Sequence, residues 1–155
     1  DSGGDGRSKG THVKVYLSAR YPRQAELRVY RDKLEALGIT VTSRWLDQPP
    51  HAEHTQQHAI EDVDDIYEAD VFVAFSEPPV EVNPAPFAAR GGRHVEFGIA
   101  YECGCTCLVV GEENVFHLLP GIGRVRSWPE ALDVLVALAE EELDARWRQI
   151  LRGLS

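Results

Sequence analysis

The sequence predicts an α/β protein in which a parallel sheet of about five strands lies between two layers of helices. Short apolar runs alternate with longer amphipathic segments along the whole chain. One run, residues 71–75 (VFVAF), is apolar throughout, as in a central strand that is buried on both faces. The 155 residues suit one domain, and 43% hydrophobic residues suffice for a core. Helical crossovers between parallel strands are right-handed, so the predicted architecture is a flavodoxin-like or Rossmann-like three-layer sandwich.

The first half of the chain alternates strand and helix twice. Residues 13–18 (VKVYLS) predict the first strand, and the apolar stripe that follows Pro22 predicts a helix that Gly38 ends. Residues 39–46 (ITVTSRWL) are rich in β-branched residues and predict the second strand. A second helix is expected at residues 53–69.

The second half begins with the strand at residues 71–75 and a long segment, residues 77–92, that holds four prolines and two glycines. Such a segment predicts a long loop, and loops of this length are usually functional. The remaining expected elements are a helix at 93–102, a strand at 107–110, a weak strand near 124–127 and a helix at 129–142 that extends toward Leu151.

The polar, glycine-rich residues 1–11 predict a disordered leader or a cloning remnant, which leaves residues 12–155 as a single domain. The formal net charge of −9 argues against DNA or RNA as a partner, because phosphate backbones require a basic face. Residues 45–89 contain ten acids and no Lys or Arg, so this segment carries the whole imbalance. A solvated acidic helix is the simplest explanation of that charge. No apolar run approaches the length of a membrane span, so no membrane partner is expected.

The sequence predicts no metal ion and no cofactor. Cys103, Cys105 and Cys107 lack the paired C-x-x-C spacing, so we expect buried thiols on one face of a strand and a reducing, cytoplasmic location. His54 and His58 stand one helical turn apart, but no third ligand has a matching spacing. Exposed helix histidines are the better interpretation.

Ligands of parallel sheets bind beyond the carboxyl ends of the strands, which selects residues 18–23, 76–96 and 111–117. Neither a P-loop nor a dinucleotide fingerprint is present. The run RGGRHVEFG at residues 90–98 stands out, because its two glycines allow close backbone approach and the helix that starts there directs its amides at an anion. Glu96 lies about one turn into this helix, where a carboxylate also has an ordinary explanation as a dipole partner.

A second carboxylate completes the pattern. We expect Asp62 and Asp70 near the same sheet edge, with Asp70 capping or turning the chain before the strand. Two carboxylates around a cleft are what the cleavage of a glycosidic bond requires, one at the anomeric carbon and one as proton donor.

With these residues the chain resembles the nucleoside 2-deoxyribosyltransferase-like family, which includes 2′-deoxynucleoside 5′-phosphate N-hydrolases and CMP or hydroxymethyl-CMP N-glycosidases. The resemblance covers nearly all of residues 12–140. The motifs that carry it are Val15-Tyr16-Leu17, Asp62-x-x-x-Ile66-x-x-Ala69-Asp70 leading into VFVAF, and Gly92-x-x-x-Glu96-x-Gly98-x-Ala100.

The resemblance implies a role for each motif residue. Glu96 resembles the nucleophile that attacks C1′ of the sugar, Asp62 the carboxylate that assists the departure of the base, and Tyr16 the tyrosine that positions the nucleophile. Asp62 as one more solvated acid and Tyr16 as core packing remain the alternatives. Residues implied in substrate binding are Ser18, Arg20, Arg23, Arg90, Gly92, Arg93 and Asn114.

Arg90 occupies the position that contacts the sugar 5′ end in the family, where it matches neither the carboxylate nor the small hydroxyl residue of the known branches. Because a guanidinium suits bidentate phosphate binding, a nucleoside 5′-monophosphate is the favoured substrate. Asn114 resembles the polar group that a neighbouring subunit lends, which implies a homodimer or higher oligomer with shared active sites. His94, where relatives often have glycine, and the long loop are departures, and Phe87 in that loop is expected to stack on a base or to anchor the loop.

The resemblance therefore implies an N-glycosidase that hydrolyses a (deoxy)nucleoside 5′-monophosphate to free base and sugar phosphate through a Glu nucleophile. A nucleoside 2-deoxyribosyltransferase that exchanges bases and a non-catalytic nucleotide-sensing domain are the alternatives. The sequence identifies neither the base nor the choice between ribose and 2′-deoxyribose.

Overall fold

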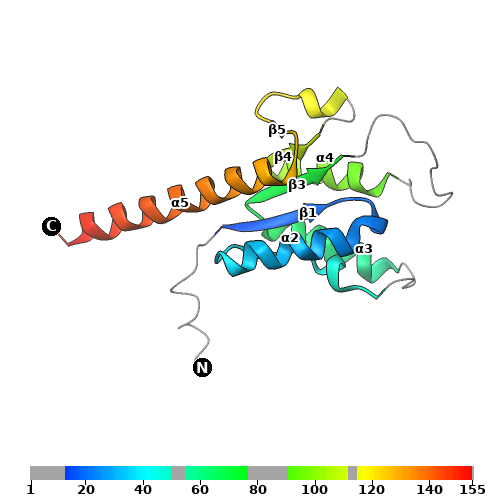
Figure 1. The fold of residues 1–155 in the computed structure, drawn as a ribbon, viewed down its shortest axis with the longest axis horizontal. Coiled ribbons are helices and arrows are strands. Elements are labelled where there is room, and N and C mark those ends of the chain that lie inside the picture. The colour runs from blue at the N-terminus through cyan, green and yellow to red at the C-terminus, as the bar shows by residue number, and fades with distance from the viewer. Residues whose placement is uncertain (1–12, 50–54, 77–90, 112–114, 155) are drawn as a thin grey trace.

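A computed structural model describes residues 13–49, 55–76, 91–111 and 115–154. Its five strands form one parallel sheet in the order β2-β1-β3-β4-β5, and helices cover both faces (Figure 1). The strands are β1 (Lys14–Ser18), β2 (Thr40–Val41), β3 (Val71–Phe75), β4 (Thr106–Val110) and β5 (Gly123–Val125). The predicted three-layer α/β fold is confirmed.

Two pairs of helices make the outer layers. The longer helices are α2 (Gln24–Ala36), α3 (Gln56–Glu68), α4 (Gly92–Cys103) and α5 (Trp128–Gly153), and the short 3₁₀ helices are η1 (Tyr21–Arg23), η2 (Arg44–Asp47) and η3 (Val115–Leu118). On one face α3 packs against α4. On the other face Tyr30 of α2 stacks on Trp128 of α5, with ring centroids 4.2 Å apart. The C-terminal half of α5 projects beyond the sheet (Figure 1).

The core is centred on β3, all of whose residues are buried, as its apolar run predicts. Phe72 of this strand stacks on Tyr16 of β1 at 5.5 Å and contacts the edge of the Phe97 ring of α4 at 6.3 Å. Because side chains alternate along a strand, Tyr16 and Ser18 share the face that α4 covers. The alternation of side chains along β1 thus directs the hydroxyl groups of Tyr16 and Ser18 toward α4.

The second predicted strand is mostly wrong. Only Thr40 and Val41 pair with β1, and the chain then turns into η2 instead of continuing as strand to residue 46. Side chains replace the missing ladder: Ser43 Oγ accepts a hydrogen bond from the Leu17 N–H (2.7 Å), and Trp45 Nε1 donates to the Leu17 carbonyl (2.8 Å). Propensity for β structure was therefore overridden by side-chain hydrogen bonds to β1.

The predicted placement of the cysteines is wrong for Cys103 and Cys105 and confirmed for Cys107. Cys103 ends α4 and is exposed, Cys105 lies half-buried in the link to β4, and only Cys107 lies buried in the strand. Cys103 belongs to the helix and not to a strand, because α4 ends only at Gly104, which adopts a left-handed conformation (φ 93°).

Other boundaries differ by a few residues. Thr55 and His58 form a capping box that starts α3 at Gln56 rather than at residue 53, which gives His58 a structural role. The last helix continues beyond residues 129–142 to Gly153, which confirms the expected extension toward Leu151. The expected leader at residues 1–11, His54 and residues 77–90 of the expected loop lie outside the described residues.

Candidate active site

The candidate site lies at the carboxyl ends of β1 and β3. These strands are neighbours in the sheet, and the chain leaves β1 toward β2 but leaves β3 toward β4, so the strand order reverses between them. Such a reversal is where open α/β sheets bind ligands. Helix α4 starts beside this edge after Gly91, whose φ of 82° suits the left-handed region. This start places Glu96 on the second turn of α4, where its carboxylate meets side chains of β1.

Both oxygens of the Glu96 carboxylate accept a hydrogen bond from β1. Tyr16 Oη donates to Oε2 (2.8 Å), and Ser18 Oγ donates to Oε1 (2.7 Å). Both donor side chains are fully buried, so their positions are fixed by packing. Two donors on separate oxygens hold the plane of the carboxylate in one orientation, while each oxygen keeps accepting capacity for another contact.

The electrostatics of this group have opposing causes. Burial raises the pKa of Glu96, and the hydrogen bonds from Ser18 and Tyr16 act in the opposite direction. The pKa of Tyr16 lies well above its ordinary value, first because of burial and then because of the charges of Glu96 and Asp62. Tyr16 therefore stays protonated and remains a donor to the carboxylate.

Asp62 of α3 lies close enough for its charge to interact with that of Glu96. Burial, followed by the repulsion of Glu96 and Asp65, raises the pKa of Asp62 to about 7. Its Oδ1 atom is buried and has no hydrogen-bond partner among the described residues. A carboxyl group that is partly protonated at neutral pH and lacks a protein partner can deliver a proton to a bound molecule.

Asp70 does not join this pair. It precedes β3 and therefore lies at the amino end of the strand, where its Oδ2 accepts a hydrogen bond from the Lys14 N–H (2.9 Å). The expectation that Asp62 and Asp70 share one edge is wrong, because α3 runs antiparallel to the strand and separates them along its length. Asp70 instead holds the start of β3 against β1.

The structure describes three of the predicted arginine ligands, Arg20, Arg23 and Arg93. Arg23 reaches the edge, since its Nη1 donates to the Ser76 carbonyl (3.3 Å), but its Nε and Nη2 are held by Glu26 at 2.8 and 2.7 Å. Arg20 caps η1 at the end of β1, and Arg93 follows Gly92 in the first turn of α4. Arg90, Asn114 and Phe87 lie outside the described residues.

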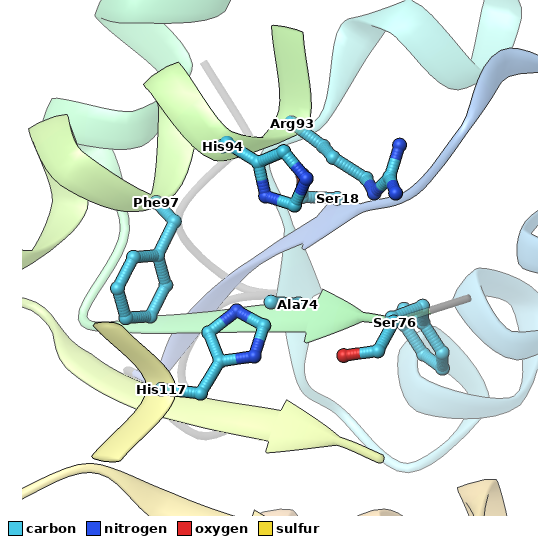
Figure 2. A pocket seen from close by; sticks show the side chains of 8 residues that line it. Ser18, Ala74, Ser76, Arg93, His94, Phe97 and His117 are labelled. Atoms are coloured by element: carbon cyan, nitrogen blue, oxygen red, sulfur yellow. The ribbon is translucent and has the colours of Figure 1, made fainter. Parts of the chain in front are cut away.

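A pocket opens at the same edge, as Figure 2 shows. Arg93 and His94 project over it from α4, and His117 projects from η3. The buried His117 ring contacts Phe97 edge-on, with centroids 5.1 Å apart. The other lining residues are Ser18, Ala74, Phe75 and Ser76.

Sequence reasoning missed Ser76 and His117. Both lie in segments that directly follow a strand carboxyl end, so the rule that selected those segments was a sufficient signal for them. His94 was noted only as a departure from the family pattern, although it faces the pocket.

No known protein-family model matches the chain, and no curated protein does. Chains of solved structures do match, among them those of two enzymes. The CMP N-glycosidase BcmB from Clostridium botulinum is 22% identical, with 80% of this chain and 98% of that chain covered and a TM-score of 0.51. The 2-deoxyribosyltransferase from Leishmania mexicana is 16% identical, with 81% and 97% covered and a TM-score of 0.59.

The chain has the fold of these two enzymes. The resemblance to the nucleoside 2-deoxyribosyltransferase-like family that the motifs indicate is thereby confirmed for the fold. Each comparison covers nearly the whole of the solved chain. Among the described residues, no helix combines the length and apolar character needed to cross a membrane. The same residues bring no three His, Cys, Asp or Glu side chains together as a metal site.

Proposed function

We propose that the protein is an N-glycosidase that hydrolyses a (deoxy)nucleoside 5′-monophosphate to free base and sugar phosphate. The observation that carries this proposal is the pairing of two unlike carboxyl groups at one strand edge. Glu96 is held through both oxygens by Tyr16 and Ser18, whereas Asp62 Oδ1 has no hydrogen-bond partner in the described part of the chain and the pKa of Asp62 is raised to about 7. One fixed carboxylate and one protonated carboxyl group are the two components of glycosidic bond cleavage.

In the proposed reaction, a Glu96 oxygen attacks C1′ of the sugar and the C1′–N bond breaks. The electron pair of that bond moves to the base, and the proton of Asp62 neutralises the departing base. The resulting glycosyl ester on Glu96 is then cleaved by water, whose proton returns to the Asp62 carboxylate. Tyr16 and Ser18 touch only Glu96 in this scheme and act as positioning residues.

The proposed phosphate ligands surround the same edge. Arg20 precedes η1 just after β1, and Arg93 lies with the backbone N–H groups of Gly92 and Arg93 in the first turn of α4, the helix that carries Glu96. A helix start and a guanidinium together suit a dianionic phosphate. Arg23 contributes its positive charge and not further hydrogen bonds, because its Nε and Nη2 already donate to the Glu26 carboxylate. Arg90 and Asn114 remain proposed ligands from the family pattern.

A homodimer or higher oligomer with shared active sites also remains a proposal. Large apolar side chains on the outer surfaces of α3 and α4 support it, since Tyr67 and Val95 are 63% and 64% exposed. Sedimentation velocity over a range of concentrations tests it, and a monomer at every concentration would contradict it.

The decisive experiment is a screen of ribo- and 2′-deoxyribonucleoside monophosphates for released base by chromatography. We expect base release by the wild type and its loss in Glu96→Gln, which keeps the shape but not the nucleophilic charge. Glu102→Gln is the matched control, because Glu102 is exposed on the same helix. Turnover that survives in Glu96→Gln contradicts the proposal.

The same assay separates the alternatives. A new nucleoside formed when a second free base is added would identify base exchange instead of simple hydrolysis, which the 2-deoxyribosyltransferase fold makes a specific second candidate. Nucleotide binding without turnover of any substrate would identify a sensing domain.

A further inference from the structure

Two cysteine sulfurs meet on the surface of the protein, away from the pocket. Cys103 is the last residue of α4 and is exposed, and its Sγ lies 3.7 Å from Sγ of Cys105. Gly104 between them has a φ of 93°, and the Cys105 N–H turns back to the Ala100 carbonyl (3.0 Å). This left-handed cap reverses the chain and brings the two side chains into contact.

We propose that Cys103 and Cys105 form a redox-active thiol pair that closes to an intramolecular disulfide. A disulfide requires the sulfurs to approach to about 2 Å. In the proposed closure the side chains rotate from this 3.7 Å contact, while the cap holds the backbone around Gly104 in its turn. The exposed Cys103 can take most of that rotation without disturbing the core.

The oxidant in this proposal is a low-molecular-weight disulfide. The Cys103 thiolate attacks one sulfur of the oxidant, forms a mixed disulfide and releases one thiolate, which takes up a proton. Cys105 then attacks the Cys103 sulfur, loses its proton to solvent and releases the second thiol. The two cysteines together lose two electrons and two protons, and the oxidant is reduced to two thiols.

The three cysteines differ in exposure, and this difference determines which of them reacts first. Burial, followed by the hydrogen bond with Cys103, raises the pKa of Cys105 to about 12, and burial raises that of Cys107 to about 11. Cys103 is exposed, so the oxidant reaches it first, and Cys105 attacks afterwards from within contact distance. Cys107 is buried in β4 and donates weakly to the Cys105 carbonyl (3.6 Å), so it remains a thiol.

The pair also connects the two helices that carry the candidate carboxyl groups. The Cys105 thiol donates to the carbonyl oxygens of Ala69 (3.4 Å) and Ile66 (3.6 Å) at the end of α3, while Cys103 ends α4. Oxidation removes the thiol hydrogen that makes these contacts. Among the described residues no third ligand joins the two sulfurs, so the pair does not form a metal site there.

The test treats the folded protein with glutathione disulfide and follows the intact mass and the number of free thiols after denaturation. We expect the wild type to lose two hydrogen atoms and to keep one titratable thiol, which peptide mapping assigns to Cys107. Cys107→Ser is the matched control and should still lose two hydrogen atoms. Cys105→Ser should stop at a glutathione adduct on Cys103, and Cys103→Ser should stay unmodified over the same time.

Three results would overturn the inference: a wild type that stops at the glutathione adduct, one that forms disulfides between chains, and one that does not react. Circular dichroism of each variant shows whether it is folded. The readout does not depend on any enzymatic activity, so its outcome is separate from that of the proposed glycosidase reaction.

Discussion

Replacing Asp62 with Asn should make the protein more stable, and increasingly so as the pH rises. Asp62 has a folded-state pKa raised from 3.8 to about 7, mainly by burial. The folded state therefore binds this proton more tightly than the unfolded state does, and ionisation of the group costs the folded state free energy. The cost is absent below pH 3.8, grows as the pH rises toward 7, and is complete above that value. Asn keeps the shape of the group but has no charge.

The magnitude follows from the same values. A rise from 3.8 to about 7 corresponds to a cost of ~4 kcal/mol in the free energy of unfolding. Asp62 is only partly buried, and solvent screening reduces this to about 2 kcal/mol. At about pH 5 the gain from Asp62→Asn should be less than half of that at about pH 8.5, because ionisation then costs the folded state only part of the full amount.

Urea denaturation of wild type and Asp62→Asn between about pH 5 and pH 8.5 measures this gain. Asp64→Asn is the matched control, because Asp64 is exposed on the same helix and its substitution removes a charge that is in water. A gain for Asp62→Asn that does not exceed the control at high pH, or that does not change with pH, would refute the argument that burial and the Glu96 charge hold this carboxyl in its neutral form.

Further expectations follow from the same contacts. Tyr16→Phe removes one of two hydrogen bonds to Glu96 and should lower kcat for base release by about 10- to 100-fold. Turnover by the wild type should fall as the pH rises through about 7, because ionised Asp62 cannot donate a proton; a pH–rate profile shows this. Arg93→Ala should raise KM for a nucleoside 5′-monophosphate by about 10-fold or more and leave KM for the free nucleoside unchanged in steady-state assays. Ser43→Ala leaves a buried backbone N–H without its acceptor and should cost about 1–3 kcal/mol in urea denaturation.

Control variants or contradicting outcomes test the three expectations that concern activity. Tyr67→Phe alters an exposed tyrosine of α3 and should leave kcat unchanged, so an equal loss in both tyrosine variants would argue against positioning of Glu96. Arg148→Ala on the exposed end of α5 should leave both KM values unchanged. Equal effects of Arg93→Ala on phosphorylated and free nucleosides would remove Arg93 from the phosphate site. A pH–rate profile that is flat between about pH 6 and pH 8.5 would remove Asp62 as the proton donor.

The sequence predicts the parts of the fold that a single periodicity determines. Residues 71–75 form β3 without change, because a short run that is apolar throughout suits a strand buried on both faces. The second strand was overpredicted, since nothing in residues 39–46 reveals that Ser43 and Trp45 hydrogen-bond to the backbone of β1. Those contacts join residues 26 and 28 positions apart, and local propensity does not register them.

For the candidate site, too, some features were predicted from the sequence and others were not. Glu96 and Tyr16 were selected by motif, and the structure brings their side chains together, while their catalytic roles stay predictions. The ion pair between Arg23 and Glu26 was not predicted, although an Arg and a Glu three residues apart on a helix commonly pair. Asp70 was correctly expected to precede the strand, but the expectation that it lies at the same edge as Asp62 was wrong, because the chain enters β3 at the opposite end from the candidate site.

The buried ionisable side chains of the candidate site cost the protein stability. Three ionisable side chains, Tyr16, Asp62 and Glu96, all have pKa values raised by burial at one strand edge, and two of them are acids that repel each other. A core built only for stability would hold apolar side chains of similar size at these positions. Asp65, on the same helix as Asp62, shows the alternative: it is buried but paired with Arg44 at 2.8 Å. The fold thus neutralises one buried acid, whereas Asp62 Oδ1 has no hydrogen-bond partner among the described residues and the group interacts with the charge of Glu96. This is the arrangement expected where an acid must act on a ligand.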